Sequence, residues 1–326
     1  MKRKKSVLFI VNPISGTEKK ELIISDIERM IDKSKFSWTF RKTEYSGHGA
    51  VLATMAAENN VDIVVAIGGD GTVNEVARSL VHTNTTLGII PCGSGNGLAR
   101  HLQISLDYRK AIETINRFNV RTLDYGTINN RPFFCTCGMG FDAAISHRFA
   151  SSIKRGILSY MENALKEVTR YQPETYTIED ETGKITGKAF LITCANASQY
   201  GNNVFIAPKA SMHDGLMDVT VIEPFTAIEA PQLAYQLLNG TLRENGHIKM
   251  FRTQKLHITR QHKGYIHCDG DPVLADTDIT VEIIPQELKV IGTNKKPMRG
   301  GTLLQTITEA FNTLVVKELR NIPIKQ

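Results

Sequence analysis

Five residues whose types suit phosphate binding follow a short apolar run: Gly68, Gly69, Asp70, Gly71 and Thr72 come directly after residues 61–67. Glycines lack a Cβ, so the backbone amides of this segment can approach a phosphate closely. Asp70 is the one charge among them, and a carboxylate there suits a hydrated Mg²⁺ or a reacting hydroxyl. Helix-spaced apolar residues follow over 73–81, with Thr72 as a candidate cap. The segment predicts a phosphate-binding strand-to-helix turn; a plain glycine turn with an aspartate cap is the alternative.

The elements that must position this turn alternate between strand and helix over about the first 125 residues. Alternation of this kind predicts a parallel sheet with helices on both faces, and binding residues at the carboxyl ends of its strands. The expected strands cover 6–11, 36–42, 61–67 and 87–90, and the expected helices cover 18–31, 49–58 and 73–81.

Each of the four expected strands runs into a polar loop. The loops are Asn12-Pro13-Ile14-Ser15-Gly16-Thr17, residues 43–49 beginning with Thr43, the turn at 68–72, and Pro91-Cys92-Gly93-Ser94-Gly95-Asn96-Gly97. Because the carboxyl ends of parallel strands meet at one edge of a sheet, we expect these loops to share one crevice. Four such loops favour a nucleotide site more strongly than one does.

From about residue 175 the pattern changes to short runs rich in β-branched and aromatic residues. Strands are expected over 175–178, 189–195, 217–222, 255–259, 264–268, 279–284 and 288–291, with one helix near 227–238. Turn residues separate these runs, which predicts an antiparallel sandwich. A helix is expected over 159–170, where it would bridge the two regions. After residue 297 an amphipathic stretch is expected to dock on the protein's own surface, a membrane-facing or dimerising helix being the alternative.

Composition places the chain among proteins with ordinary buried cores. It has 326 residues, of which 41% are hydrophobic, and a formal net charge of +6. No apolar run is long enough to span a membrane and no signal-peptide core precedes the first strand, so we expect a cytoplasmic protein. The positive charge suits an anionic partner, and without an RNA-binding type of motif we expect no nucleic acid. The five cysteines and nine histidines show no zinc-ligand spacing.

Two further glycine patterns bear on the nucleotide. The chain lacks the Gly-x-x-x-x-Gly-Lys-Ser/Thr sequence of P-loop enzymes. Residues 138–143, Gly-Met-Gly-Phe-Asp-Ala, match a dinucleotide-binding pattern but lie between the two regions, so we interpret them as a packing turn.

Two acidic turns lie in the second half, at His213-Asp214-Gly215 and at Asp269-Gly270-Asp271. Taken alone, each is typical of a solvated Asp-Gly turn. Together with the four loops, however, they resemble the diacylglycerol kinase catalytic-domain superfamily of lipid kinases, which also contains sphingosine and ceramide kinases. The resemblance rests on Asn12-Pro13 with Ser15-Gly16, Gly68 to Thr72 with Asn74-Glu75, Gly93 to Asn96, the 203–218 segment, and Asp269-Gly270-Asp271, and it spans about residues 6–292.

The resemblance implies an α/β plus all-β fold with the active site in the cleft. It implies an ATP-binding α/β domain over 1–130 and a β-rich lipid-substrate domain over 131–295, followed by a helical extension over 296–326. The residues implied to hold ATP are Asn12, Pro13, Ser15, Gly16, Thr43, Gly68, Gly69, Asp70, Gly71, Thr72, Asn74, Glu75, Gly93, Ser94, Gly95 and Asn96.

The resemblance also assigns the acidic residues. Asp70 would organise Mg²⁺ at the transferring phosphate, and Ser211, Asp214 and Leu216 match a position where bacterial members bind a structural Mg²⁺. Asp269 and Asp271 match an Asp-Gly-Glu element that supplies the proton acceptor; Asp271 is favoured, although Asp is one methylene shorter than Glu. The Ser-Gly-Asn sequence at 94–96 looks more like the sphingosine kinase branch.

We therefore expect transfer of the γ-phosphate of ATP to the hydroxyl of a diacylglycerol-like or sphingoid-type lipid. The protein would associate peripherally with the inner face of the membrane. The sequence leaves a homodimer open. The competing hypotheses are a soluble-metabolite kinase of the NAD kinase kind and a non-catalytic nucleotide or lipid sensor.

Overall fold

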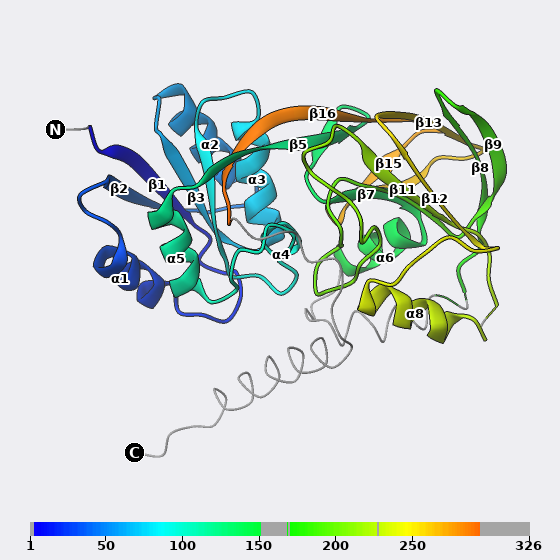
Figure 1. Cartoon of the computed structure of the whole chain (residues 1–326), viewed down its shortest axis with the longest axis horizontal. Coiled ribbons are helices and arrows are strands. Elements are labelled where there is room, and N and C mark those ends of the chain that lie inside the picture. Colours follow the sequence, from blue (N-terminus) through cyan, green and yellow to red (C-terminus); the bar gives the residue numbers. More distant parts are fainter. Residues whose placement is uncertain (1–2, 151–167, 169, 227, 294–326) are drawn as a thin grey trace, which may run out of the picture.

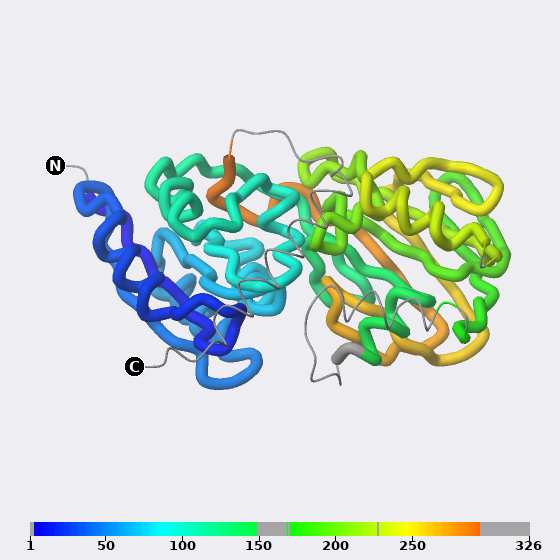
Figure 2. Tube along the Cα trace, turned by 90° about the horizontal axis from the view of Figure 1, so that it is seen from below, coloured from blue at the N-terminus to red at the C-terminus, as the bar shows by residue number. Residues whose placement is uncertain are grey.

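The computed structural model describes residues 3–150, 168, 170–226 and 228–293. These residues form two lobes side by side (Figure 1). Figure 2 gives the same arrangement at a right angle, with the first 120 residues in one lobe. Most of the helix expected over 159–170 and all of the extension over 296–326 lie outside the described residues.

The first lobe contains the predicted alternation of strands and helices. Its strands and helices are β1 Lys5–Val11, α1 Lys20–Met30, β2 Phe36–Lys42, α2 His48–Glu58, β3 Ile63–Gly68, α3 Asp70–Leu80, β4 Thr86–Pro91, α4 Gly97–His101 and α5 Tyr108–Arg117. The strands pair in parallel in the order β2-β1-β3-β4. α3 begins three residues earlier than predicted, with Gly69 as its N-cap. Thr72 therefore lies inside the helix, and its prediction as a cap is wrong.

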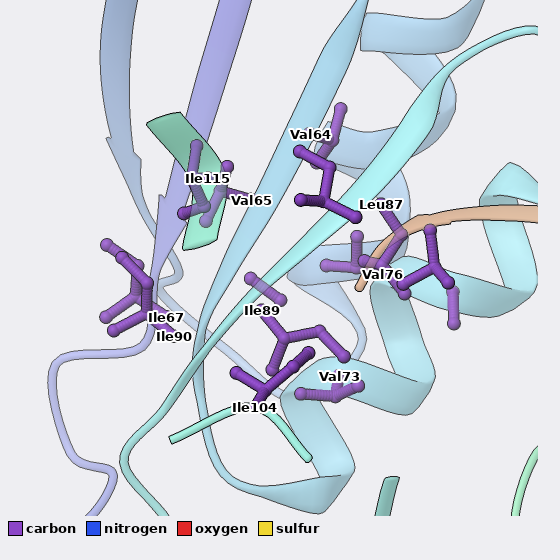
Figure 3. Packing of buried hydrophobic residues seen from close by; sticks show 14 of the residues in the cluster. Val64, Val65, Ile67, Val73, Val76, Leu87, Ile89, Ile90, Ile104 and Ile115 are labelled. Atoms are coloured by element: carbon purple, nitrogen blue, oxygen red, sulfur yellow. The ribbon is translucent and has the colours of Figure 1, made fainter. Parts of the chain in front are cut away.

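The core of this lobe lies on both faces of the sheet. All residues of β3 and β4 are buried, as expected for central parallel strands covered on two sides. Figure 3 shows Val73 and Val76 of α3 packing against one face and Ile115 of α5 lying near Val65 on the other. The buried strands hold the loops at their carboxyl ends in fixed positions.

The second lobe is built from antiparallel strands. One sheet has the order β12-β11-β10-β7-β14-β15, and a second contains β13, β8 and β9. The bounds are β6 Arg131–Phe133, β7 Thr136–Gly140, α6 Phe141–Ala150, β8 Glu174–Asp180, β9 Gly183–Ala189, β10 Leu191–Ala195, β11 Met217–Ile222, α8 Ala230–Asn239, β12 Ile248–Thr253, β13 Lys255–Arg260, β14 Gly264–Cys268 and β15 Asp271–Ala275. One buried cluster contains side chains of both sheets, including Tyr176 and Val219. The predicted antiparallel sandwich is confirmed.

Two long strands connect the lobes: β5 Val120–Ile128 and β16 Asp278–Ile291, which run across the top of Figure 1. β16 pairs with β13 at one end and, through Val290 opposite Leu87, with β4 at the other. The sheet of the first lobe therefore continues into the second. The two strands expected over 279–284 and 288–291 are one strand with an irregularity between Ile284 and Leu288. The domain limits at 130 and 295 stay predictions.

Candidate active site

The polar loops at the carboxyl ends of β1, β3 and β4 touch one another. Gly16 has a φ of +61°, and a Cβ there would lie 1.8 Å from the carbonyl oxygen of Cys92. A Cβ on Gly93 would lie 2.5 Å from the Cα of Gly69. Glycine is thus required at these contacts by close backbone approach. Asn12 adds a side-chain bond, because its Nδ2 donates to the Thr72 Oγ1 at 2.9 Å.

Asp70 fastens the last of these loops to α3. Its Oδ2 accepts from the backbone N–H of Asn96 and its Oδ1 from that of Gly97, both at 2.7 Å. A Cβ on Gly95 would lie 2.6 Å from the Asp70 Oδ2, so glycine is needed here too. Burial raises the pKa of Asp70, while the two N–H donors act in the opposite direction.

Glu75 performs the same task for the loop after β2. Its two carboxylate oxygens accept from the backbone N–H groups of Gly47 at 2.7 Å and Gly49 at 3.0 Å. Thr43, at the start of that loop, donates its N–H to the carbonyl of Val11 at 2.9 Å. All four loops are therefore fixed around the N-terminus of α3, which supports the crevice expected from the sequence.

The remaining predicted ATP-binding residues lie in the same loops. Pro13, Gly71 and Ser94 are exposed. Ser15 donates its hydroxyl to the carbonyl of Asn12 at 3.0 Å, which stabilises the first loop. The first N–H groups of a helix have no intrahelical acceptor, so the N-terminus of α3 can meet an anion at these loops.

Two basic residues at the loops were missed by the sequence reasoning. Lys20 is 3% exposed, and its Nζ donates to the carbonyl of Ser15 at 2.5 Å. The second is Arg100 in α4. Its Nε donates to the carbonyl of Gly95 at 2.9 Å, and its Nη1 to the Asn203 Oδ1 at 3.1 Å in the second lobe. Arg100 thus ties the crevice to the other lobe.

Asp269 is the most extensively hydrogen-bonded carboxylate between the lobes. It accepts the backbone N–H groups of Phe134 at 2.8 Å, Cys135 at 2.7 Å and Thr136 at 3.0 Å. It also accepts from the Asn74 Nδ2 of α3 at 2.8 Å. Burial raises the pKa of Asp269, and all four donors act against that rise. The structure thus brings together Asn74 and Asp269, which lie 195 residues apart.

Asp271 has a different environment. Its side chain is exposed, and no hydrogen bond of its carboxylate is recorded among the described residues. Surrounding protein atoms still desolvate it and raise its pKa; the nearby charge of Arg78 lowers the pKa, while those of Glu75 and Asp70 raise it. Charged residues of the crevice therefore influence Asp271. Of the two candidate proton acceptors, Asp269 is held by four hydrogen bonds and Asp271 is not.

An arginine lies at the turn over 211–216, beside one of the predicted metal ligands. Asp214 forms an ion pair through its Oδ2 with the Nη2 of Arg252, whose Nε lies 3.5 Å from the Asp218 Oδ2. The Arg252 guanidinium therefore supplies the positive charge at this turn. A structural Mg²⁺ held by Ser211, Asp214 and Leu216 stays a prediction.

An apolar cavity of about 470 Å³ opens beside the crevice. Side chains of α8 and of the aromatic cluster around Phe190 line one end, including Leu233 and Leu237. The other end is polar and is lined by Asp70, Asn74, Asp142, His267, Asp269 and Gly270. Its acidic and basic lining residues are three aspartates and one histidine, without a lysine or arginine among those described. The cavity thus joins an apolar space to the predicted phosphate-transfer residues.

Comparisons with known proteins match both lobes. Residues 6–128 match the diacylglycerol kinase catalytic domain, and residues 135–292 match the YegS C-terminal NAD kinase beta sandwich-like domain. A protein of Chromohalobacter salexigens named "Probable lipid kinase YegS-like" is 30% identical over 240 residues, covering 71% of this chain and 76% of the relative. The chain belongs to this lipid kinase family. The predicted family and its enzymatic class, lipid kinase, are confirmed.

Other relatives of this lipid kinase agree. The diacylglycerol kinase of Bacillus subtilis is 26% identical over 272 residues, covering 82% of this chain and 90% of the relative. A crystal structure of a diacylglycerol kinase from Bacillus anthracis matches with a TM-score of 0.72 over 90% of this chain and 98% of that one, at 20% identity. At that identity the structural match establishes the fold alone.

The described residues of the lipid kinase include neither a candidate membrane-spanning helix nor a candidate metal-binding cluster. None of their helices combines the length and apolar character needed to cross a membrane. No group of three or more His, Cys, Asp or Glu side chains among them is arranged to hold a metal ion. Asp70 still fits a Mg²⁺ delivered with a nucleotide, because Mg²⁺ commonly binds through one or two carboxylates together with substrate phosphates.

Proposed function

We propose that this lipid kinase transfers the γ-phosphoryl group of ATP to the hydroxyl of a long-chain lipid whose hydrocarbon chain occupies the 470 Å³ cavity. The observation that carries the proposal is the position of that cavity: its polar end is lined by Asp70 and Asp269, one from each lobe. A diacylglycerol-like or a sphingoid-type lipid is the acceptor class, and the protein would meet it at the inner face of the membrane.

The loops would hold ATP with its phosphates at the N-terminus of α3. Mg²⁺ bound to those phosphates would neutralise their charge during in-line transfer, and Asp70 is the carboxylate that we assign to hold it. No covalent enzyme intermediate is needed. Pro13, Gly71 and Ser94 are exposed, so a bound nucleotide could contact them.

Asp271 is the proposed proton acceptor. Each oxygen of Asp269 already accepts two N–H donors, so protonating Asp269 would weaken the bonds that hold its turn, one of which comes from Asn74 in the other lobe. Asp271 carries no such bonds among the described residues, and its raised pKa suits a general base better than an ordinary aspartate. The shorter side chain of Asp relative to Glu is compatible with this role if the turn is held firmly.

The test is transfer of labelled γ-phosphate from ATP to a panel containing diacylglycerol, sphinganine and NAD, the lipids being presented in mixed micelles. We expect a phosphorylated lipid, loss of transfer when EDTA removes Mg²⁺, and a fall of roughly 10²–10⁴-fold in kcat for Asp271→Asn. Arg78→Lys is the matched control, because it keeps the neighbouring positive charge. Transfer to NAD without any lipid product would favour the soluble-metabolite kinase, whereas ATP binding without transfer would favour the sensor.

A further inference from the structure

A buried polar cluster lies at the polar end of the cavity and is formed by Asp142, Thr193, Tyr200 and His267. Asp142 is 7% exposed, His267 1% and Thr193 0%. The Asp142 Oδ2 accepts from the Thr193 Oγ1 at 2.9 Å and from the Tyr200 hydroxyl at 3.2 Å. None of these four residues is among those proposed to bind ATP. Three of them, Asp142, Tyr200 and His267, line the cavity.

The hydrogen bonds of His267 determine which ring nitrogen carries the proton. The backbone N–H of Gly270 can only donate, and it lies 3.3 Å from the His267 Nδ1. Nδ1 is therefore an acceptor, and the proton of the neutral ring is on Nε2. That Nε2 lies 3.1 Å from the Asp142 Oδ2 and donates to it. Asp142 thus fixes both the tautomer and the orientation of the ring.

His267 in turn holds the tight turn that carries Asp271. β14 and β15 are joined by Asp269 and Gly270 alone, with φ values of +49° and +89°. Two central residues with positive φ form a type I′ hairpin turn. Four donors fix the Asp269 side chain, and the bond to His267 fixes the next peptide, between Asp269 and Gly270. The position at which Asp271 begins β15 depends on both restraints.

We propose that His267 is a positioning residue that connects the acceptor cavity to the general base: Asp142 orients the ring, and the ring holds the Gly270 amide so that Asp271 faces the acceptor hydroxyl. The proposal rests on the proposed function for the roles of the cavity and of Asp271. A lipid whose polar end contacts Asp142 would contact the first residue of the hydrogen-bonded chain from Asp142 through His267 to Gly270. The chain runs from α6 through β14 to the hairpin turn.

Two substitutions separate the two bonds of the ring. In His267→Asn the side-chain oxygen takes the place of Nδ1, so it can accept from Gly270 but cannot reach Asp142. In His267→Gln the side-chain NH₂ takes the place of Nε2, so it can donate to Asp142 but leaves the Gly270 amide without an acceptor. The two variants are uncharged amides of similar size, which makes each the control for the other.

We expect kcat to be at least about tenfold lower in His267→Gln than in His267→Asn, because small misplacements of a catalytic group cost up to ~10²-fold. KM for ATP should be alike in both, since the loops that hold ATP do not contact the ring. Amide hydrogen exchange of the peptide containing Gly270 and Asp271 should be faster in His267→Gln. Asp142→Ala serves if His267→Gln does not fold, and should likewise lower kcat and speed this exchange, because it removes the acceptor that orients the ring.

The outcomes are distinguishable from failure of the proposed function. If the wild-type protein phosphorylates no lipid but the exchange rates still separate the two variants, the lipid reaction is wrong and the positioning of the turn by His267 stands. If the wild-type protein is active and the variants have equal kcat and equal exchange, the positioning role is overturned. A large change in KM for ATP with kcat unaltered would overturn it as well.

Discussion

Replacing Asp269 with asparagine should destabilise the hairpin turn of the second lobe together with its hydrogen bond to Asn74 of α3 in the first lobe. Each carboxylate oxygen accepts two donors: Cys135 and Thr136 on Oδ1, and Phe134 and Asn74 on Oδ2. The amide side chain of the Asp269→Asn variant keeps one acceptor oxygen and places an NH₂ group against the other two donors. The Asn74 amide can turn so that its Oδ1 accepts from the new NH₂ group, but the Phe134 N–H is left without an acceptor. A buried donor without an acceptor costs ~1–3 kcal/mol, so we expect a loss of about that size. At its upper end that is a large fraction of the ~5–15 kcal/mol that stabilises a typical protein.

The partner in α3 offers a specific rescue. Asn74→Asp alone places a second carboxylate against Asp269 and should also destabilise the protein. In the double variant the new amide at position 269 can donate to the new carboxylate at position 74, which restores one bond with the donor and acceptor exchanged. The double-mutant cycle should therefore give a favourable coupling of at least ~1 kcal/mol.

Urea unfolding measures these changes with two signals. Trp38, the single tryptophan, lies in β2 of the first lobe and reports on that lobe through its fluorescence, while far-UV circular dichroism reports on both. We expect the Asp269→Asn variant to unfold at lower urea and the double variant to recover part of the difference. Destabilisation below ~1 kcal/mol for Asp269→Asn, or effects of the two substitutions that add within ~0.5 kcal/mol, would refute the reasoning.

Three further predictions test the cavity, a buried histidine and the turn at 211–216. Leu233→Trp puts a larger side chain into the cavity, so it should raise KM for the lipid while KM for ATP changes little; equal effects on both constants in steady-state assays would contradict the assignment of the cavity. Burial, assisted by the charge of His213, lowers the pKa of His101 to about 4 from 6.5, so the unfolded chain takes up the proton first and the folded protein should lose roughly 3 kcal/mol as the pH falls from about 6.5 to 4. His101→Asn, which can still accept from the Ser198 N–H, should show a smaller loss over that range in urea titrations; an unaltered pH dependence would contradict the argument. Arg252→Ala removes the counter-charge of Asp214 and of the buried Asp218, and should cost ~1–3 kcal/mol; thermal melts with and without Mg²⁺ should then show a larger stabilisation by Mg²⁺ in the variant than in the wild type, and equal shifts would mean that Arg252 does not stand in for a cation.

The sequence predicted a strand correctly where the pattern of apolar residues along it matches the burial of those residues in the fold. The residues of β3 and β4 are buried on both faces, so their apolar runs were unmistakable. β9 was missed because six of its seven residues are exposed and its sequence, Gly183–Ala189, is polar. The segments 279–284 and 288–291 form one strand, β16, that pairs with β5 and β4. These contacts join residues about 150 to 200 positions apart, which periodicity cannot reveal.

The candidate site was predictable to the extent that it is made of short motifs. Glycine turns with Asp or Asn at fixed spacing carry their own geometry, and they identified all four loops. Asp142 and His267 lie 125 residues apart, and neither has a local signal. The glycine pattern at 138–143 was interpreted as a packing turn, which gave its aspartate no role. In the fold, a Cβ at Gly138 would lie 2.4 Å from the Asp142 Oδ2, so this glycine makes room for the polar cluster.

Most carboxylates of the motifs accept hydrogen bonds that hold other segments in place, and this affects what a substitution at each of them can show. Asp70, Glu75 and Asp269 each accept two or more backbone N–H groups from another segment. Substitution at any of the three therefore moves a loop as well as removing a charge, and lost activity alone does not identify a metal ligand or a base. Asp271 has no recorded bond of this kind among the described residues, so its substitution removes chemistry with the least change in geometry. Of the four carboxylates, Asp271 thus gives the most direct test of the chemical step, because its loss leaves the loops and the connection between the lobes intact.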